Sequence, residues 1–184
     1  MRALTRPGGS SASLREMAGE AGVGLPTIVH YFGSRDGLVR AALAEVRAQG
    51  EPWLRVTREV GLDGGLGPSC RFVLGQVALG WGFGLGLTFS QSLAAGFDSP
   101  DLGPATVNEV LEPTLAALEH RLGVHQARDE LAADADLRHA ALVLLCPPLV
   151  GLLHQQSLGG AGCRPLDLDR FLDDHVARFV RGWS

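Results

Sequence analysis

Lysine is entirely absent from this 184-residue sequence, and the 16 arginines that supply its positive charge are outnumbered by 20 acidic residues. The formal net charge of -4 excludes a uniformly basic coat for nucleic acid but leaves a local basic patch open. Residues 1–50 hold six arginines and four acids, a balance of +2, whereas residues 51–184 hold ten arginines and sixteen acids, a balance of -6. The sequence therefore predicts a basic amino-terminal segment on an acidic body.

Cysteine is also scarce, and the three that occur, Cys70, Cys146 and Cys163, are widely spaced. An odd number at such spacing fits neither a disulfide framework nor a zinc ribbon, so we expect reduced thiols in a cytoplasmic protein without a structural metal. The first nine residues lack the apolar stretch of a secretory signal, and nothing in them predicts export.

Catalytic motifs are missing as well. The six histidines include no His-x-x-x-His pair, there is no Gly-x-Ser-x-Gly turn, and the glycine-rich stretch after residue 79 lacks the lysine of a phosphate-binding loop. We therefore expect no catalytic residue, no metal site and no cofactor, and a function in binding instead of catalysis.

Two runs without charge, residues 72–97 and 139–163, are each long enough to cross a bilayer if histidine is neutral. Glutamine, serine and proline interrupt these runs, and Trp81 lies inside the first instead of at its edge, where membrane interfaces place tryptophan. Core helices of a soluble bundle are also apolar on nearly every side. We favour core helices and expect no membrane partner.

What the sequence does contain is a succession of helix signals with almost no strand alternation. Ser13 and Glu16 have the spacing of a capping box, and Gly22 predicts the end of that helix. A second, short helix is expected from about Gly24, with Pro26 tolerated in its first turn. We therefore predict an all-α protein that begins with two short helices separated by a glycine turn, which is the plan of a DNA-binding helix-turn-helix.

A third helix is expected to begin after Ser34 and to be interrupted by Gly50 and Pro52. The interruption predicts a domain boundary at residues 48–52. It separates a helix-turn-helix DNA-binding domain, residues 1–50, from a helical-bundle domain for effector binding and dimerisation, residues 51–184.

Apolar residues at helical spacing predict further long helices in the bundle domain. They span residues 104–122, with a kink at Pro113 and an end at Gly123, residues 136–158, with a bend at the proline pair, and residues 168–183.

The segment from Ser13 to Leu38, SLREMAGEAGVGLPTIVHYFGSRDGL, resembles the DNA-binding signature of the TetR family of one-component transcriptional regulators. The rest of the chain resembles the family only as an all-helical body of suitable length. The resemblance implies a contact of Arg15 with guanine or phosphate in double-stranded operator DNA. It implies base contacts for Leu25, Pro26 and His30, and phosphate contacts for Thr27, Tyr31 and Arg35.

Two departures from the family pattern matter. Residue 29 is valine where the family most often has an aromatic residue, so only an apolar base contact is expected there. Only twelve residues precede Ser13, and Pro7, Gly8 and Gly9 are among them, where the family has a complete helix. We expect that first helix to be largely missing, either because the true start lies upstream, which we favour, or because the DNA-binding domain is weakened.

The resemblance also implies that the last two helices pair with their copies in a homodimer. The sequence itself shows only that two broad apolar faces need cover. A twofold dimer covers them and sets two recognition helices about 34 Å apart, which suits a palindromic operator.

The uncharged run 72–97 is the expected wall of a pocket for a small apolar effector. Its aromatic residues offer apolar surface, its glutamines offer hydrogen bonds, and its glycines predict a bent or mobile helix. An ordinary aromatic core cluster explains the same residues equally well. The predicted ligand-binding residues are Gln76, Trp81, Phe83, Phe89, Gln91, His154 and Gln155.

Together these features predict a ligand-responsive transcriptional regulator, specifically a repressor that binds a palindromic operator as a homodimer and releases it when an effector binds. The alternative is a helical ligand-binding or interaction module that has lost DNA binding through loss of its first helix.

Overall fold

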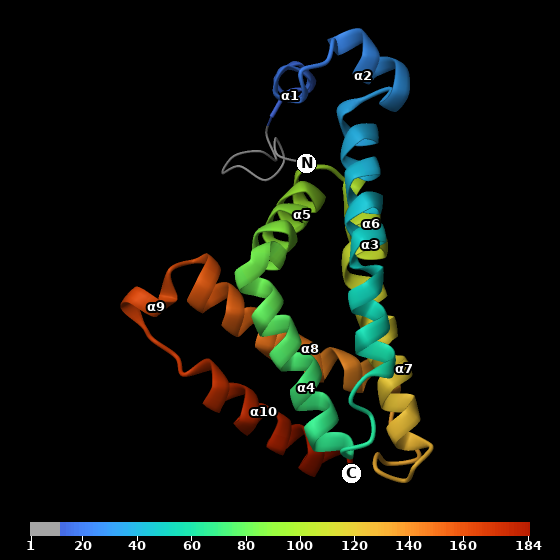
Figure 1. Ribbon diagram of the computed structural model, residues 1–184, viewed down its shortest axis with the longest axis vertical. Helices are drawn as coiled ribbons and strands as arrows, with labels where there is room; N and C mark the ends of the chain where they lie inside the picture. Colours follow the sequence, from blue (N-terminus) through green and yellow to red (C-terminus); the bar gives the residue numbers. More distant parts are fainter. Residues whose placement is uncertain (1–11) are drawn as a thin grey trace. The chain divides into compact units, whose positions relative to one another are not determined.

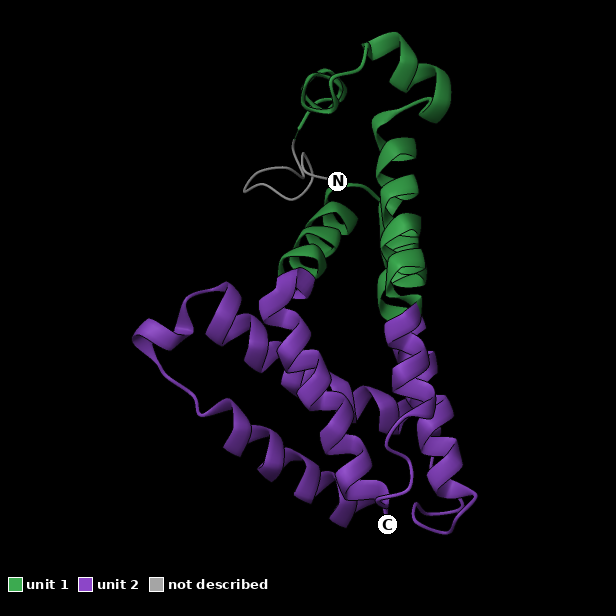
Figure 2. Ribbon diagram, in the orientation of Figure 1, with its two compact units in different colours: residues 1–51, 87–112 green, residues 52–86, 113–184 purple. Residues whose placement is uncertain are grey.

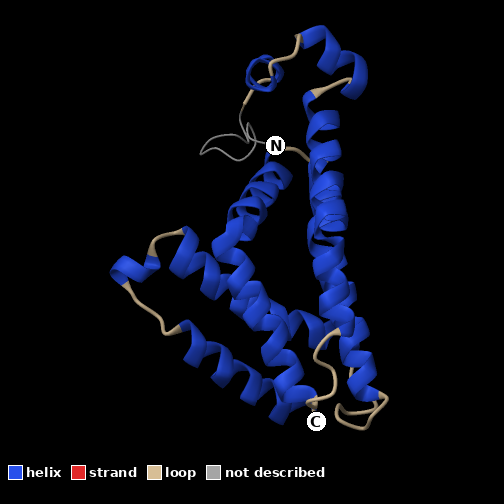
Figure 3. Cartoon of the chain, in the orientation of Figure 1, coloured by secondary structure: helices blue, strands red, loops and turns tan. Residues whose placement is uncertain are grey.

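The computed structural model describes residues 12–184, and within that range every regular element is a helix (Figures 1 and 3). The predicted all-α fold class is confirmed. The α-helices, in chain order, are α1 (Leu14–Ala21), α2 (Leu25–Phe32), α3 (Arg35–Glu59), α4 (Leu66–Gly80), α5 (Gly86–Asp98), α6 (Leu102–Thr106), α7 (Glu112–Gln126), α8 (Leu137–Leu152), α9 (Gly160–Cys163) and α10 (Leu168–Trp183). Within the same range, π-helical turns follow α4, α6 and α8, namely η2 (Trp81–Leu85), η3 (Val107–Leu111) and η4 (Leu153–Ser157).

The chain forms two compact units (Figure 2). The first contains the described residues up to Glu51 together with Leu87–Glu112, and the second contains Pro52–Gly86 and Pro113–Ser184. Residues 87–112, which the sequence assigned to the second domain, thus belong to the first unit. The functional division into residues 1–50 and 51–184 stays a prediction.

The interruption expected at Gly50 and Pro52 is wrong, because α3 continues through both residues to Glu59. A proline inside a helix removes one backbone hydrogen bond and leaves those of its neighbours in place. Leu54 and Thr57, which follow the proline, are buried in the second unit. Packing therefore holds the helix together where local propensity would end it.

The helix end expected at Gly123 is also wrong, since α7 runs on to Gln126. Its last turn carries His125, which is fully buried and hydrogen-bonded, so tertiary contacts again extend the helix. A π-helical segment, η3, ends at Leu111, two residues before Pro113; the kink expected at Pro113 itself stays a prediction. The proline pair of α8 lies inside that helix, and η4 follows it directly.

A small apolar cluster holds the first unit together. Val39 and Leu43 of α3 pack with Ala95 of α5 and Leu102 of α6. All four side chains are buried, and Leu102 is fully so. Helices α3, α5 and α6 therefore form one packed body, and α1 and α2 belong to the same unit.

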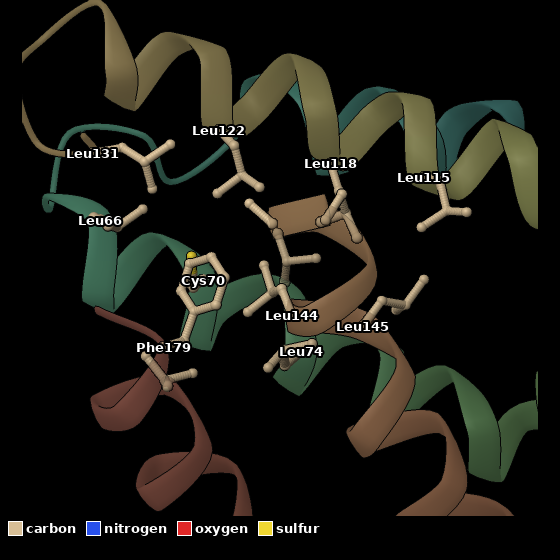
Figure 4. Close-up of a cluster of buried hydrophobic side chains, with 14 of the residues drawn as sticks. Leu66, Cys70, Leu74, Leu115, Leu118, Leu122, Leu131, Leu144, Leu145 and Phe179 are labelled. Carbon is tan, nitrogen blue, oxygen red and sulfur yellow. The ribbon is translucent and has the colours of Figure 1, made fainter. Parts of the chain in front are cut away.

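A larger core fills the second unit, where α4, α7, α8 and α10 supply most of the side chains and the loop between α7 and α8 supplies Leu131 (Figure 4). Arg71 on the outside of α4 ties it to α10, donating from Nε to Asp173 at 2.5 Å and from Nη2 to Asp169 at 2.9 Å. The hydrogen bond to Asp173 is the largest cause of the raised pKa of Arg71. This fork fixes α10 along α4 from the solvent side.

Two helical stretches, Leu66–Asp98 and Leu137–Ser157, are long and apolar enough by length and composition to cross a membrane. Each of them contributes fully buried residues to the core of the second unit, among them Leu74 and Leu144. The structure therefore uses both stretches as core helices.

A buried arginine joins the elements of the second unit. Arg121 of α7 is fully buried and donates from Nε to the Thr57 carbonyl at 2.6 Å, and from its other nitrogens to the Val60 carbonyl and to both oxygens of Ser69. Its guanidinium carbon also lies 5.9 Å from the centre of the Phe72 ring. One side chain thus binds the carboxyl end of α3 to the first turn of α4.

A chain of hydrogen-bonding groups leads from Arg121 to a carboxylate. His125 lies 2.7 Å from Ser69 Oγ through Nε2 and 2.7 Å from Glu130 through Nδ1. A neutral imidazole that donates from Nδ1 to Glu130 and accepts the Ser69 hydroxyl proton satisfies every group in this chain. Ser69 and His125 have no exposed surface, so no substrate reaches this serine and the network is structural.

Burial acts on both ionisable groups beside Phe72. It lowers the pKa of Arg121, and it raises the pKa of the neighbouring Cys70 thiol to about 12. Cys70 therefore stays a neutral thiol at physiological pH and adds no charge to the core.

We expect Arg121→Ala to lower the free energy of unfolding by about 3–5 kcal/mol, because it leaves the Thr57 and Val60 carbonyls and Ser69 without their donor in a buried site. This corresponds to a drop of roughly 6–20 °C in melting temperature. Arg128→Ala is the control, since Arg128 is exposed and donates to the Leu62 carbonyl at the surface; it should cost under about 1 kcal/mol. Equal melting temperatures for the two variants would contradict the role assigned to Arg121.

Candidate nucleic-acid interface

Local contacts define both helices of the helix-turn-helix. Ser13 Oγ accepts from the Glu16 amide at 3.3 Å, and the Glu16 carboxylate accepts from the Ser13 amide at 2.7 Å, which is the predicted capping box. The hydrogen bonds from Ser13 hold the pKa of Glu16 below its ordinary value. Gly22 ends α1 in the left-handed conformation at φ 67°, and α2 begins after Gly24, as the sequence predicted.

Buried side chains fix the angle between the two helices. Met17 and Ala18 of α1 and Ile28 of α2 are 3–5% exposed, and α1 and α2 contact each other. Val23 and Phe32 do not belong to this core, because they are 43% and 38% exposed. Val23 lies in the turn and Phe32 is the last residue of α2, so neither lies on the face where the helices meet.

The remaining residues of α2 turn toward solvent. We call this set the recognition surface; it consists of Pro26, Thr27, Val29, His30 and Tyr31. Tyr31 is 74% exposed, and the His30 ring meets its ring edge-on at 5.2 Å between centroids. Leu25 lies beside them, half-buried at the start of the helix. The structure thus brings together on α2 all five residues that were predicted there for DNA contact.

The two predicted arginines differ in their surroundings. Arg15 of α1 is exposed and has no hydrogen bond or ion pair with any residue from 12 to 184 that the structure describes. Arg35 at the start of α3 is partly buried, donates from Nε to the Ala12 carbonyl at 3.1 Å, and forms an ion pair with Asp36 at 3.5 Å. Only Arg15 of the two has a guanidinium that is free of described partners.

A glycine brings α2 and α3 into direct contact. Ser34 Oγ accepts from the Gly37 amide at 3.1 Å, so Ser34 caps α3 as predicted. A Cβ atom on Gly37 would lie 2.0 Å from the Phe32 carbonyl oxygen, a distance that two such atoms do not adopt. The sequence predicted the Ser34 cap but not the close approach of Gly37 to Phe32, because that approach depends on how tightly the chain turns at Gly33 and Ser34.

The predicted ligand-binding residues are divided between the two units. Gln76, Trp81, Phe83, His154 and Gln155 belong to the second unit, whereas Phe89 and Gln91 lie on α5 in the first. Trp81 is buried and donates from Nε1 to Ser157 Oγ at 3.1 Å, which joins η2 to η4. Phe83, by contrast, is 86% exposed. The helix is irregular here, as the glycines predicted, with Gly84 at φ 107°.

The side chain of Gln155 also forms its hydrogen bonds within the protein. It is buried, lies 2.7 Å from His154 Nδ1, donates to the Arg164 carbonyl at 2.9 Å and accepts from the Leu166 amide at 2.9 Å. These contacts hold the chain between α9 and α10 against η4. Its position next to a histidine in the sequence gave no indication of this role.

An open hollow of about 600 Å³ lies on the exposed side of α8. Of the predicted ligand-binding residues, it contains only His154. Its other lining residues are Cys146, Pro147, Val150, Gly151, Leu166 and Phe171. The sequence predicted a pocket along residues 72–97 instead. It could not predict this hollow, because α8 is apolar on both its buried and its exposed side, and the sequence does not show which side faces solvent.

Two short helices joined by a glycine turn, with one buried face and one exposed polar and aromatic face, define a helix-turn-helix DNA-binding protein with an all-helical body. Residues 1–42 match the family described as bacterial regulatory proteins, tetR family. The amino-terminal segment of the chain thus has the sequence of a tetR-family DNA-binding domain, and together with the helix-turn-helix geometry this supports a role in transcriptional regulation. The family match includes the segment before Ser13; the expected loss of the first helix falls there, on residues outside those the structure describes.

A solved structure has the same fold over the whole chain. It is a protein from Mesorhizobium loti described as a TetR-family transcriptional regulator, 20% identical in sequence, with a TM-score of 0.67 over 100% of this chain and 94% of that one. A comparison with curated proteins found no significant match.

Gly37→Ala should disturb the contact between α2 and α3, because the new methyl group displaces the Phe32 carbonyl; we expect a loss of about 1–3 kcal/mol in unfolding free energy. Gly19→Ala is the matched control, since a Cβ there meets nothing within 4 Å on an exposed turn of α1. It should stabilise the protein by about 0.5–1 kcal/mol. Amide hydrogen exchange of residues 25–32 and thermal denaturation measure both effects, and the same response in the two variants would show that Gly37 is not constrained.

Proposed function

We propose that this regulator is a cytoplasmic, ligand-responsive repressor that binds a palindromic operator as a homodimer. The observation that carries the proposal is the recognition surface of α2, five solvent-facing residues held on a short helix whose opposite face is buried through Ile28. A helix with this exposure, placed second in a helix-turn-helix, enters the major groove.

The side chains of this surface, and of Leu25 beside it, suit the contacts required. Leu25, Pro26 and His30 offer apolar and imidazole contacts to base edges. Thr27 and Tyr31 offer hydroxyl donors to phosphate oxygens, which set the register on the duplex. Arg15 adds an exposed guanidinium that has no partner among residues 12–184, so its charge competes with no internal bond from that part of the chain.

The proposed homodimer is supported by an apolar row on α8. Val143, Cys146, Pro147 and Val150 are exposed, although they lie on a core helix, and Val150 is 64% exposed. The exposed side of α10 is charged, with Asp169, Asp173, Arg178 and Arg181. An apolar centre beside a charged rim is the composition of a protein interface. The hollow shares Cys146, Pro147 and Val150 with this row, so we assign it to the dimer interface instead of the effector site.

For the effector we keep the predicted class, a small apolar molecule, and the predicted residues around η2 and η4. The irregular turn at Gly84 supports a segment that changes shape at low cost. Ligand control requires only that the effector bind one state of the dimer more tightly than the DNA-binding state.

Operator binding is tested by fluorescence anisotropy with DNA from upstream of the regulator's own gene. We expect Arg15→Ala to weaken binding by roughly 5- to 150-fold, the effect of losing about 1–3 kcal/mol from one specific contact. Arg164→Ala is the control, because Arg164 is an exposed arginine of the second unit whose described hydrogen bonds involve only its backbone; it should bind like the wild type. Absence of specific binding by the wild type, with or without an upstream extension, would favour the alternative of a binding module without DNA recognition.

Dimerisation is tested by sedimentation equilibrium of Val143→Glu. Val143 and Val60 are each 46% exposed, but only Val143 lies on the α8 row. A glutamate at 143 enters the interface twice by symmetry, and burying two unpaired carboxylates should raise the dimer dissociation constant on the order of 100-fold. Val60→Glu should leave it unchanged. A wild-type monomer, or dimers of equal strength in both variants, would rule out this interface.

A further inference from the structure

A polar chain crosses the first unit from the entry of α1 to the turn between α5 and α6. Arg35 Nε donates to the Ala12 carbonyl at 3.1 Å, and Arg35 Nη1 pairs with Asp36 Oδ1 at 3.5 Å. The other carboxylate oxygen of Asp36 accepts from the Ser99 hydroxyl at 2.9 Å. These bonds join residues that are 23 and 63 positions apart in sequence.

Ser99 is itself fixed in place. Its carbonyl accepts from the amides of Leu102 and Gly103 at 3.0 and 3.2 Å, which start α6. Its hydroxyl oxygen accepts from the Asp101 amide at 3.3 Å, and this leaves the hydroxyl proton for Asp36. The serine therefore presents a preoriented donor to the first turn of α3.

At the other end, the chain fixes the start of α1. Ala12 is the residue directly before Ser13, the cap of α1, and Arg15 follows in the first turn of that helix. The carbonyl held by Arg35 therefore sets where the helix that carries Arg15 begins. Because α1 contacts α2, and Met17 of α1 and Ile28 of α2 are both buried, the same bond helps to set the position of the recognition surface.

The surroundings strengthen these bonds. The side chains of Arg35 and Asp36 are 26% and 29% exposed. One turn further along α3, Val39 is 1% exposed and packs on Leu102 of α6. Charged hydrogen bonds that are partly withdrawn from water, at the edge of an apolar cluster, are stronger than their exposed counterparts.

We propose that Arg35, Asp36 and Ser99 form a positioning relay, which holds α1 and the recognition surface in place for DNA from the α5–α6 turn. The proposal rests on operator binding as the function. It replaces the predicted contact of Arg35 with phosphate, since the guanidinium bonds Ala12 and Asp36 within the protein. Ser99, whose α5–α6 turn lies outside the helix-turn-helix, becomes a determinant of DNA affinity.

Salt dependence separates positioning from phosphate contact. Each phosphate contact contributes about 0.9 to the slope of the logarithm of the binding constant against the logarithm of salt concentration. Arg35→Ala should weaken operator binding and leave that slope unchanged, whereas loss of a phosphate contact would reduce it by about 0.9. Arg35→Lys keeps the positive charge but not the forked guanidinium. If Arg35 acts in the relay, this variant should bind the operator as weakly as Arg35→Ala; if Arg35 contacts phosphate, it should recover much of the wild-type affinity.

Ser99→Ala removes the last link without touching a charge. We expect operator affinity to fall about fivefold to tenfold, with an unchanged salt slope, and Ser99→Thr to restore most of it. Asp36→Asn should weaken binding similarly, although the loss of a negative charge near DNA would by itself strengthen it. Asp98→Asn is the control, since it neutralises an exposed acid next to Ser99 and should not weaken binding. In a double-mutant cycle, Arg35→Ala and Ser99→Ala should be less than additive.

A measurement without DNA keeps this test independent of the proposed function. Amide hydrogen exchange over residues 14–21 should be faster in Ser99→Ala than in the wild type or Asp98→Asn, because α1 has lost part of its anchor. If Arg35→Ala does not fold, Ser99→Ala and Arg35→Lys decide the matter. Unchanged exchange and unchanged affinity in Ser99→Ala would overturn the relay; failure of the wild type to bind DNA, with faster exchange in Ser99→Ala, would overturn operator binding alone.

Discussion

The structure of the second unit depends on satisfying one buried positive charge. Arg121 lies in a core of leucines, and its donors reach only backbone carbonyls and a serine, so the elements that carry these acceptors must meet at its position. The end of α3, the first turn of α4 and the middle of α7 are therefore fixed together. His125 and Glu130 extend the network to a compensating carboxylate at the surface. Displacing any of these elements would expose an unpaired group in the core.

Signals within one turn of helix could be predicted from the sequence. Ser13 with Glu16, Gly22 and Ser34 mark helix ends correctly because their hydrogen bonds join residues three or four positions apart. The helix ends predicted at Pro52 and Gly123 were wrong, because burial of Leu54 and His125 stabilises the helix more than the low helix propensity of proline and glycine destabilises it. Arg121 lies next to Leu118 and Leu122 on the apolar face of α7. A charged residue beside an apolar stripe is the one feature of the sequence that could have indicated a buried hydrogen-bond network.

The candidate interface could be predicted to the extent that exposure follows from helical periodicity. The residues of α2 face solvent because Ile28 faces α1. Arg35 bonds the Ala12 carbonyl 23 residues before it, and its neighbour Asp36 bonds Ser99 63 residues further on, so no local pattern distinguishes this arginine from Arg15. The same limit applies to Trp81. The apolar, glycine-rich segment around it suggested a ligand-binding wall, but its hydrogen bond is to Ser157, which is 76 residues away in sequence.

The recognition surface has a consequence for how such a protein diversifies. Its five side chains face solvent, while the helices beneath them are held by Met17, Ala18 and Ile28 and by the caps at their ends. Exposed substitutions away from caps and cores change folding stability little, typically within about 0.5 kcal/mol. Thr27, His30 or Tyr31 can therefore be exchanged over evolutionary time at almost no cost to the fold. Under the proposed function, a duplicated copy of the gene is free to acquire a different operator while it keeps the same scaffold.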